Sequence, residues 1–492
     1  MTYRWTRFFI LRLLGLLYLM GFWILVQQGL PLLGKDGLLP AESFVARWVE
    51  YQGGTNAAFW RLPSLFILTG VSDRWMLALA WGGVLLSLVV LAGYANAIVM
   101  AVLWALYMSF VHVGQLFYGY GWEIQLLETG FLAIFLCAPL DPRPLPATDP
   151  PLPVLWLYRW LIFRVMLGAG LIKIRGDECW RDLSCLFFHY ETQPIPNPLS
   201  PLFHFLPHWL GEASVLFNHF CELIVPFFVF GPRRIRHAAA GFLLAFQCLL
   251  ILSGNLAFLN WLTLIPIVAC FDDSRLARLV PARWRERAKG ALVPRGRGQR
   301  VATWGLVLVV ISLSFGPIGN LLSSQQAMNT SFDPFDLVNT YGAFGSVGRQ
   351  RDEIVFEGTT DAELSHRTQW KAYEFRCKPG DPNRRPCWMS PYHYRIDWQI
   401  WFAAMTNPEG APWTLHFVWK LLHGDKGTLS LLAADPFPDA PPRFVRATLY
   451  RYRFAPLGQK AWWERERLRE WLPPLSVDDP RLRRFLVGYG WL

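Results

Sequence analysis

The chain has 492 residues, of which 53% are hydrophobic and 16% aromatic, and it carries 25 tryptophans and a formal net charge of +11. So much aromatic sequence with only 17% charged residues argues against a soluble protein, because membrane interfaces are where tryptophan and tyrosine gather. The basic charge is not accompanied by a recognition module, so we expect no nucleic acid as a partner.

The first apolar stretch has the basic start and apolar core of a signal peptide. No small-residue cleavage site follows Val26, where Gln27 and Gln28 come next, so we expect the stretch to remain as a membrane anchor. Residues 57–70 are also apolar, but this segment is short and contains Arg61, which favours a re-entrant or interfacial segment over a span.

Long stretches without charged residues indicate membrane-spanning helices. Residues 75–115 and 237–271 contain no Asp, Glu, Lys or Arg. Each stretch is longer than one span of about 20 residues and is broken at its centre by turn residues, so each predicts a helical hairpin. Over the whole chain we expect nine spans, at about residues 9–28, 75–92, 95–114, 122–139, 154–174, 213–231, 238–253, 256–271 and 302–320.

The positions of Lys and Arg predict the orientation of the chain. Three arginines lie within the first 12 residues, and other basic residues crowd the loops 231–237 and 272–300, the second of which includes Lys289. Basic loops stay on the cytoplasmic side of a membrane. With nine spans, all three basic segments fall in the cytoplasm and the C-terminal region falls outside, and these segments explain most of the net charge.

Polar side chains inside the predicted spans form a second pattern. Such groups usually face the interior of a helix bundle or a wet cavity. Most of them fall in the outer half of the membrane on different helices, and we expect Arg164, near the middle of the fifth span, to pair with Glu222 or Glu128. We therefore predict an outward-opening polar cavity lined by His112, Glu123, Glu128, Arg164, His219, Glu222 and Asn260.

An alternative for these residues is hydrogen bonding within the bundle alone. In that case His219 and Glu222 form a buried pair in the core. Glu123 and Glu128 are five residues apart and therefore lie on different faces of their helix, so they are not a carboxylate pair that shares one site.

Lys173 ends the fifth span, after the small residues Gly168, Ala169 and Gly170. A lysine in apolar sequence at a membrane edge is energetically costly and invites a functional reason. Desolvation would lower its pKa and suit it to act as a catalytic base at the rim of the cavity. The small residues leave room for a ligand tail or for close packing of another helix. The alternative is a lysine that extends to the membrane interface.

The eight cysteines fall into two groups. Those in the spans are expected to be small buried apolar residues: Cys137, Cys221, Cys248 and Cys270. The other four face an oxidising compartment, so we predict two local disulfides, Cys179–Cys185 and Cys377–Cys387. A redox-exchanging pair is the alternative, although neither spacing is C-x-x-C. We expect no metal site, because no cysteine–histidine pattern of the usual zinc-binding spacing is present.

A proline-punctuated loop follows the first cysteine pair. Its prolines impose an extended path, along which His189, Glu191 and Gln193 alternate and point together into a cleft. The interpretation we favour over a cleft is a stiff cap over the helix ends. The loop motif comprises His189, Glu191, Gln193, Pro194, Pro196 and Asn197.

The pattern of the sequence changes after Ser323, from long apolar spans to shorter predicted strands and helices. Strands are predicted at 353–357, 371–376 and 442–454, and helices at 393–404 and 412–423. Residues 462–471 are expected to form a helix, either amphipathic at the membrane interface or solvated at the surface. The fold class is therefore a polytopic α-helical membrane domain, residues 1–321, followed by a C-terminal extracytoplasmic β-rich (α+β) domain, residues 322–492.

Several long and unusual strings resemble the lipase maturation factor family of membrane proteins. They lie at residues 34–40 (GKDGLLP), 167–203, 218–227 (NHFCELIVPF), 337–345 (LVNTYGAFG), 357–359, 419–425 (WKLLHGD) and 446–452 (RATLYRY). The resemblance implies a chaperone or redox-environment factor that helps secreted lipases to fold and dimerise. Its outer domain would contact the client protein, and its membrane-spanning helices would contact the membrane lipids. The membrane would be that of the endoplasmic reticulum in animals, or the plasma membrane with a periplasmic domain in bacteria.

A fainter resemblance is to vitamin K-dependent γ-carboxylase, another multi-span protein with a lumenal β domain. Its lysine follows a small-residue helix and precedes a tryptophan, as Lys173 precedes Trp180 here. This resemblance implies that Lys173 is a base for a quinone-like lipid.

Three functions therefore compete. The first is a maturation factor that needs no cofactor, the second a membrane enzyme acting on a quinone-like lipid, and the third a thiol–disulfide partner that uses Cys179 and Cys185. The first is favoured because the resemblance is long and no complete catalytic constellation is present. The chain has no G-x-S-x-G motif and no phosphate-loop or dinucleotide fingerprint, which disfavours a serine hydrolase and nucleotide chemistry.

Overall fold

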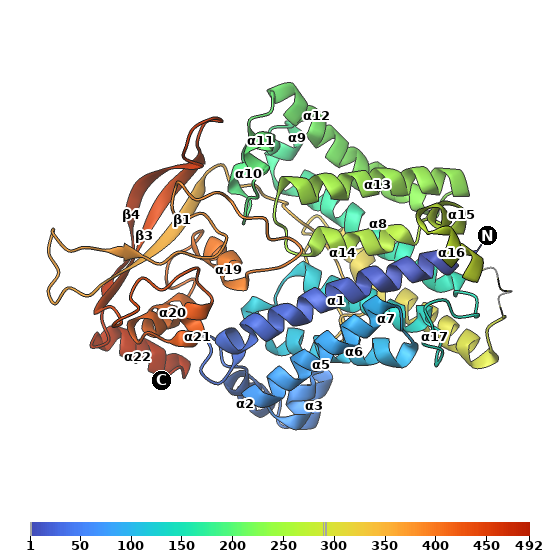
Figure 1. Ribbon diagram of the computed structural model, residues 1–492, viewed down its shortest axis with the longest axis horizontal. Helices are drawn as coiled ribbons and strands as arrows, with labels where there is room; N and C mark the ends of the chain where they lie inside the picture. The colour runs from blue at the N-terminus through green and yellow to red at the C-terminus, as the bar shows by residue number, and fades with distance from the viewer. Residues whose placement is uncertain (1, 289, 291–292) are drawn as a thin grey trace.

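The computed structural model describes residues 2–288, 290 and 293–492. Helices fill one end of the molecule, and a small sheet with further helices fills the other (Figure 1). Lys289, one of the basic residues used to predict orientation, lies outside the described residues.

Among the described residues, six helical stretches are long and apolar enough to cross a membrane. They establish an integral membrane protein. They are α1 (Arg4–Leu33), α5 (Asp73–Ala92), α8 (Leu152–Gly176), α12 (His208–His219) with its continuation to Phe230, α13 (Arg233–Ser253), and α17 (Arg297–Leu313) with α18 (Phe315–Leu322).

The other three predicted spans correspond to shorter helices. These are α6 (Ala97–Val113), α7 (Gly121–Leu136) and α14 (Leu259–Val268). At a rise of 1.5 Å per residue, even the 17 residues of α6 reach only about 26 Å, slightly less than the hydrocarbon core of about 30 Å. Helix α14 has ten residues and contains Pro266.

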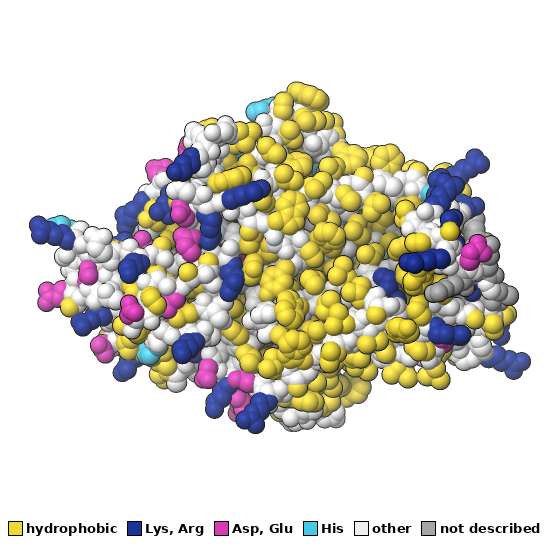
Figure 2. Space-filling model, in the orientation of Figure 1, with side chains coloured by type: hydrophobic (Ala, Val, Ile, Leu, Met, Phe, Trp, Pro, Cys, Tyr) yellow, Lys and Arg dark blue, Asp and Glu magenta, His cyan; other side chains and the backbone are white. Residues whose placement is uncertain are grey.

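The helical hairpins turn where the charge-free stretches are broken. Gly93, whose φ of 124° suits glycine, follows the last residue of α5, and Asn96 caps the start of α6 by accepting a hydrogen bond from the Val99 N–H. Hydrophobic side chains cover the helical part of the surface, whereas charged ones gather at its two ends (Figure 2). This banding fits a membrane around the helices.

The segment expected to be re-entrant or interfacial contains two short helices, α3 (Thr55–Arg61) and α4 (Leu65–Thr69). Neither approaches the length of a span. The remaining short helices are α2 (Ala41–Tyr51), α9 (Glu178–Arg181), α10 (Leu186–Thr192), α11 (Ser200–His204), α15 (Asp273–Leu276) and α16 (Ala282–Arg287), with single turns at Gln115–Phe117 and Ala277–Leu279.

The C-terminal part contains a four-stranded antiparallel sheet in the order β2-β1-β3-β4. Helices pack beside it (Figure 1). The strands are β1 (Arg351–Thr359), β2 (Lys371–Ala372), β3 (Phe444–Phe454) and β4 (Trp463–Leu475), and the helices are α19 (Arg395–Ala403), α20 (Trp413–Leu422), α21 (Lys426–Ser430) and α22 (Pro480–Tyr489).

The prediction of a helix at residues 462–471 is wrong, because these residues belong to β4. Glutamate, arginine and leucine favour a helix locally, but pairing with β3 overrides that preference. Glu464 lies opposite Arg453, and Glu466 lies opposite Arg451, so the alternating charges become cross-strand pairs. The strand predicted at 371–376 is shortened to the two residues of β2.

A buried cluster of charges fixes the sheet to the proline-punctuated loop. Arg351, at the start of β1, donates to the carbonyl oxygens of Glu191 (2.9 Å), Gln193 and Pro194 (2.8 Å). Its guanidinium also lies 2.5 Å from the carboxylate of Glu353, and Lys378 Nζ lies 2.9 Å from the same carboxylate. Arg351 therefore holds loop and sheet together.

Replacing Arg351 with Met should destabilise the protein by about 3 to 5 kcal/mol, because three carbonyl groups and part of a buried carboxylate lose their partner. The matched control is Arg451→Ala on β3, which removes a partly exposed ion pair with Asp352 and should cost less than about 1 kcal/mol. Thermal unfolding of the detergent-solubilised protein, followed by tryptophan fluorescence, measures both. Equal losses would contradict the assignment of Arg351 as the link.

Candidate functional site

The polar residues of the spans meet segments of the C-terminal part of the chain. Glu123 and Glu128 lie in α7 and are fully buried, at 0% and 1% exposure. Each carboxylate pairs with a different arginine, Glu123 with Arg395 and Glu128 with Arg164. The two glutamates therefore form two separate sites, as their five-residue spacing implies.

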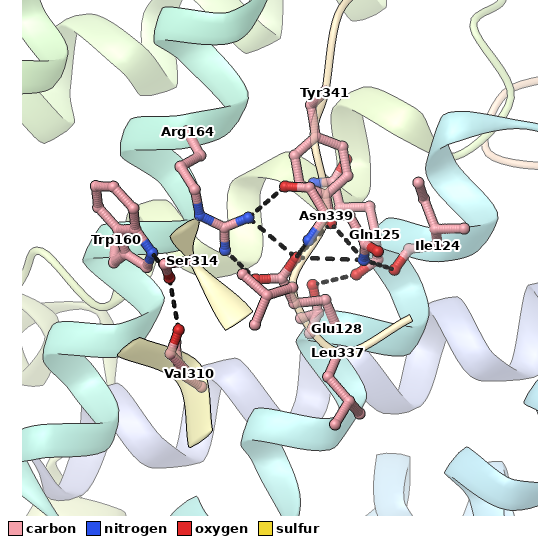
Figure 3. Close-up of polar contacts among 12 residues, drawn as sticks. Ile124, Gln125, Glu128, Trp160, Arg164, Val310, Ser314, Leu337, Asn339 and Tyr341 are labelled. Atoms are coloured by element: carbon pink, nitrogen blue, oxygen red, sulfur yellow. Dashed lines mark hydrogen bonds and ion pairs between the residues drawn. The ribbon is translucent and has the colours of Figure 1, made fainter. Parts of the chain in front are cut away.

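The first site joins α7, α8 and the segment 337–345 (Figure 3). Arg164 forms an ion pair with Glu128 and donates to the carbonyl oxygen of Asn339 at 2.5 Å. The second carboxylate oxygen of Glu128 accepts from the Asn339 N–H at 3.0 Å and from the Tyr341 hydroxyl at 2.7 Å. The structure thus gives Arg164 the partner Glu128, one of the two expected from the sequence.

Small residues of α8 make room for this inserted segment. A Cβ at Gly168 would collide with the carbonyl oxygen of Tyr341, and a Cβ at Gly176 would collide with that of Gly345. Gly170 instead packs against Glu222 and Leu223, which lie in the helical stretch that follows α12. Of the two uses considered for the small residues, the structure shows close packing of protein segments.

The second site joins α7 to the start of α19. Arg395 donates to Glu123 Oε1 at 2.8 Å and to the carbonyl oxygen of Phe117 at 2.6 Å. The Tyr107 hydroxyl donates to Glu123 Oε2 at 2.5 Å, so both oxygens of the carboxylate are engaged. The ring of Tyr118 lies 3.4 Å from the guanidinium carbon of Arg395. Partners thus engage the whole carboxylate, whereas Nε and the second terminal nitrogen of Arg395 are buried without a hydrogen-bond partner among the described residues.

Lys173 is buried rather than extended to the membrane interface. Its Nζ lies 2.6 Å from Glu222 Oε1 and 3.0 Å from Asn218 Oδ1, and 4.9 Å from the centre of the Trp180 ring. Glu222 is held in a π-helical turn, Phe220–Ile224, that follows α12. The ammonium group therefore connects the end of α8 to the end of α12 and the π-helical turn that follows it.

The other predicted cavity residues contact separate partners. His219 Nε2 lies 2.8 Å from the carbonyl oxygen of Trp180, so it does not form the expected buried pair with Glu222. His112 lies 3.0 Å from Asp336, and Asn260 donates to Gln247 at 2.8 Å. In the part of the chain that the structure describes, these side chains divide into local clusters that also engage residues 336–341 and 395.

The expected extended path from His189 is wrong at its start, because His189 and Glu191 lie in α10. The alternation of three side chains into one cleft is lost, since helical residues two apart face different directions. Burial, with a smaller contribution from the positive charge of Lys173, lowers the pKa of His189 to about 3.

The rest of the loop motif bridges the end of α13 and the sheet. Gln193 donates to the carbonyl oxygen of Ser253 at 2.9 Å, and Asn197 to that of Leu252 at 3.0 Å. Glu191 accepts from the Phe454 N–H at 2.8 Å. The backbone carbonyls of Pro194 and Pro196 accept from Arg351 and Asn255. These contacts are those of a stiff cap over helix ends.

Both predicted disulfides are present, Cys179–Cys185 and Cys377–Cys387. Asp177 lies close to the first of them, in an arrangement whose spacing would suit a metal ion. Because both sulfurs are bonded to each other, they offer no thiolate to a metal. Cys248 is exposed on α13, contrary to the expectation that it is buried.

Sequence reasoning missed the partners that come from the C-terminal part of the chain. These are Asp336, Asn339, Tyr341 and Arg395, together with Asn218 beside Lys173. Asn218 had a local signal, because it lies one helical turn before Glu222. The others lie at least 175 residues from their partners in the chain. The depth of a residue in the membrane does not predict which of these distant residues it contacts.

A double-mutant cycle on Glu123 and Arg395 tests the second site. Glu123→Leu and Arg395→Met should each destabilise the protein by about 3 to 5 kcal/mol, because each leaves a buried charge without its partner. The double variant should lose clearly less than the sum of the two. Thermal unfolding in detergent provides the measurement, and additive losses would show that the two charges do not interact.

The low pKa of His189 predicts a dependence of stability on pH. The fold holds the neutral imidazole, so its contribution is complete above the ordinary pKa of 6.5 and is lost as pH falls towards the folded value of about 3. Between pH 7.5 and 5.0, the wild type should lose about 2 kcal/mol more than His189→Gln. Unfolding is measured at both pH values. An equal loss in the two proteins would contradict the burial of a neutral histidine.

Two family models match the chain. The lipase maturation factor transmembrane domain matches residues 5–278, and the lipase maturation factor C-terminal domain matches residues 337–473. No solved structure matches the chain.

Curated relatives align along the whole chain. Lipase maturation factor 1 from Bos taurus is 46% identical, over 100% of this chain and 92% of its own length, and the Mus musculus protein is 47% identical, over 100% and 90%. Lipase maturation factor 2 from Rattus norvegicus is 30% identical, over 96% of this chain and 83% of its own length. The chain therefore belongs to the lipase maturation factor family.

Proposed function

We propose that this protein is a membrane-bound maturation factor that assists the folding and assembly of secreted proteins such as lipases. The observation that carries the proposal is the similarity to proteins named lipase maturation factor 1 along the entire chain, at 45 to 47% identity. The similarity includes both the helical part and the C-terminal part, so the machinery of those relatives has its counterpart here.

The proposed topology has nine spans, a cytoplasmic N-terminus and an outer domain of residues 322–492 on a membrane domain of residues 1–321. The N–H groups of Arg4 and Trp5 donate to Asp273, which brings the basic N-terminus beside the start of the basic loop 272–300. Two basic segments at the same end of the bundle support a common cytoplasmic side. The relatives' family suggests the endoplasmic reticulum membrane in an animal, and a bacterial chain would have a periplasmic domain.

In this arrangement the outer domain is a fixed platform for the client. The Arg164–Glu128–Asn339 and Arg395–Glu123 sites hold its segments against α7 and α8. The disulfides fit an oxidising compartment, where secreted proteins also form theirs. A platform held by several buried contacts presents one surface to a folding chain without rearranging.

No observation favours the enzyme in which Lys173 is a base for a quinone-like lipid. The Nζ atom of Lys173 is engaged by Glu222 and Asn218 in the described structure, which supports a role in joining helices. Neither family match describes a cofactor-binding domain, in keeping with a function that needs no cofactor.

Complementation tests the proposed function. In animal cells that lack their own maturation factors, expression of this chain should restore the secretion of an active, dimeric lipase. Two matched variants accompany the wild type. Arg395→Met should lower the restored lipase secretion several-fold, because docking of the domain is lost. Lys173→Met should restore secretion in proportion to the amount of the variant that is folded. Lipase activity in the medium is divided by the amount of folded factor. No restoration by well-inserted wild-type protein would contradict the proposal.

A further inference from the structure

A crevice of about 450 Å³ lies between helix α1 and the outer domain. Its volume lies in the range of small-molecule sites. One wall comes from α1 and the other from the outer domain, and the lining residues are Trp23, Gln27, Gln28, Arg376, Tyr392, Tyr394, Ser430 and Leu431. None of these residues takes part in the ion pairs that hold the domains together.

The crevice lies at the level of a membrane surface. Trp23 is 19 residues after Arg4, which corresponds to about 29 Å along α1 and is close to the thickness of the hydrocarbon core. Trp23 also packs edge-on against Trp81 of α5, with ring centres 5.9 Å apart, and Trp81 is exposed. Tryptophans gather at this depth because they are partly apolar and partly polar.

The surface changes character at the same place. Helix α1 crosses the visible face towards α20 and α21 (Figure 1), and the hydrophobic surface gives way to a charged one where the helical part meets the outer domain (Figure 2). A molecule in the crevice would therefore have its polar end against the outer domain and its apolar end towards the hydrophobic band. Lipids have a polar headgroup and apolar tails arranged in this way.

Arg376 provides an available positive charge in the crevice. It is exposed, its guanidinium donates to the carbonyl oxygen of Ser430 at 2.7 Å, and it lies 5.8 Å from the centre of the Tyr394 ring. Among the residues that the structure describes, no carboxylate forms an ion pair with it. Its remaining N–H groups can donate to an anion, and arginine binds phosphate through paired donors.

Polar groups beside Arg376 fit the rest of a headgroup. Tyr392 accepts from Gln28 at 3.0 Å through its hydroxyl oxygen, which fixes the ring and leaves its O–H free to donate. Gln27 is exposed on the wall formed by α1. Trp23 and Leu431 add apolar surface. We propose that this crevice binds the phosphate headgroup of an anionic phospholipid from the outer leaflet.

Native mass spectrometry of the full-length protein in detergent tests the proposal. The probe is palmitoyl-oleoyl phosphatidylglycerol, compared with the matching phosphatidylcholine. One phosphatidylglycerol should stay bound per chain, and Arg376→Ala should weaken its binding about tenfold, because a charge-assisted interaction is removed. Arg376→Lys keeps the charge but loses the paired donors, so its binding should fall between that of Arg376→Ala and that of the wild type. The control is Arg367→Ala, an exposed arginine of the same domain outside the crevice, which should bind like the wild type.

Three outcomes would overturn the proposal. The first is equal retention of phosphatidylglycerol by Arg376→Ala and the wild type, and the second is a comparable loss in Arg367→Ala. The third is binding of glycerol 3-phosphate with no retention of the lipid, which would assign the site to a soluble phosphate. Each variant is first shown to unfold at the wild-type temperature. The result is independent of lipase secretion, which is measured separately.

Discussion

The arrangement of this protein depends on two carboxylates of one short helix. Glu123 and Glu128 of α7 are buried where the helical part meets the C-terminal part of the chain, and each is paired with an arginine. A buried unpaired carboxylate is energetically costly, so each site favours the docked arrangement over any in which its partners are absent. Because Arg395 and Asn339 both come from the C-terminal part of the chain, the charges in the helical part determine where the C-terminal part sits.

The same constraint explains why α8 has glycines where the segment 337–345 is inserted beside it. The backbone of residues 337–345 runs against Gly168 and Gly176 of α8, and a side chain at either position would push it away. The strings at 167–203 and 337–345, which carried the family resemblance, are thus two sides of one contact. Further along, Arg351 fixes the proline-punctuated loop to the sheet, and Lys173 fixes α8 to the helical stretch beside it. The C-terminal part of the chain is therefore joined to the helices by several independent polar contacts.

Much of the helical architecture could be predicted because hydrophobic length and turn residues are local signals. The hairpin of α5 and α6 turns at Gly93–Asn96, and the disulfides join cysteines only 6 and 10 residues apart. The tail was predicted to be helical because Glu464–Arg467 favours a helix locally, and only the distant partner β3 makes it a strand. The polar residues were placed at a common depth, but their division into clusters depends on Asp336, Asn339 and Arg395. Contacts between residues so far apart in the chain have no periodic signal.

Hydrogen–deuterium exchange of the segment 337–345 measures whether Glu128 holds this segment in place, because its backbone amides report whether the segment is inserted. In the wild-type protein the Asn339 amide, which donates to Glu128, should exchange as slowly as those of the paired strands β1 and β3. In Glu128→Gln the segment should exchange much faster while the strands stay protected. Fast exchange of this segment in the wild type would contradict this conclusion, since the buried carboxylate of Glu128 would then not hold the C-terminal part of the chain against the helices.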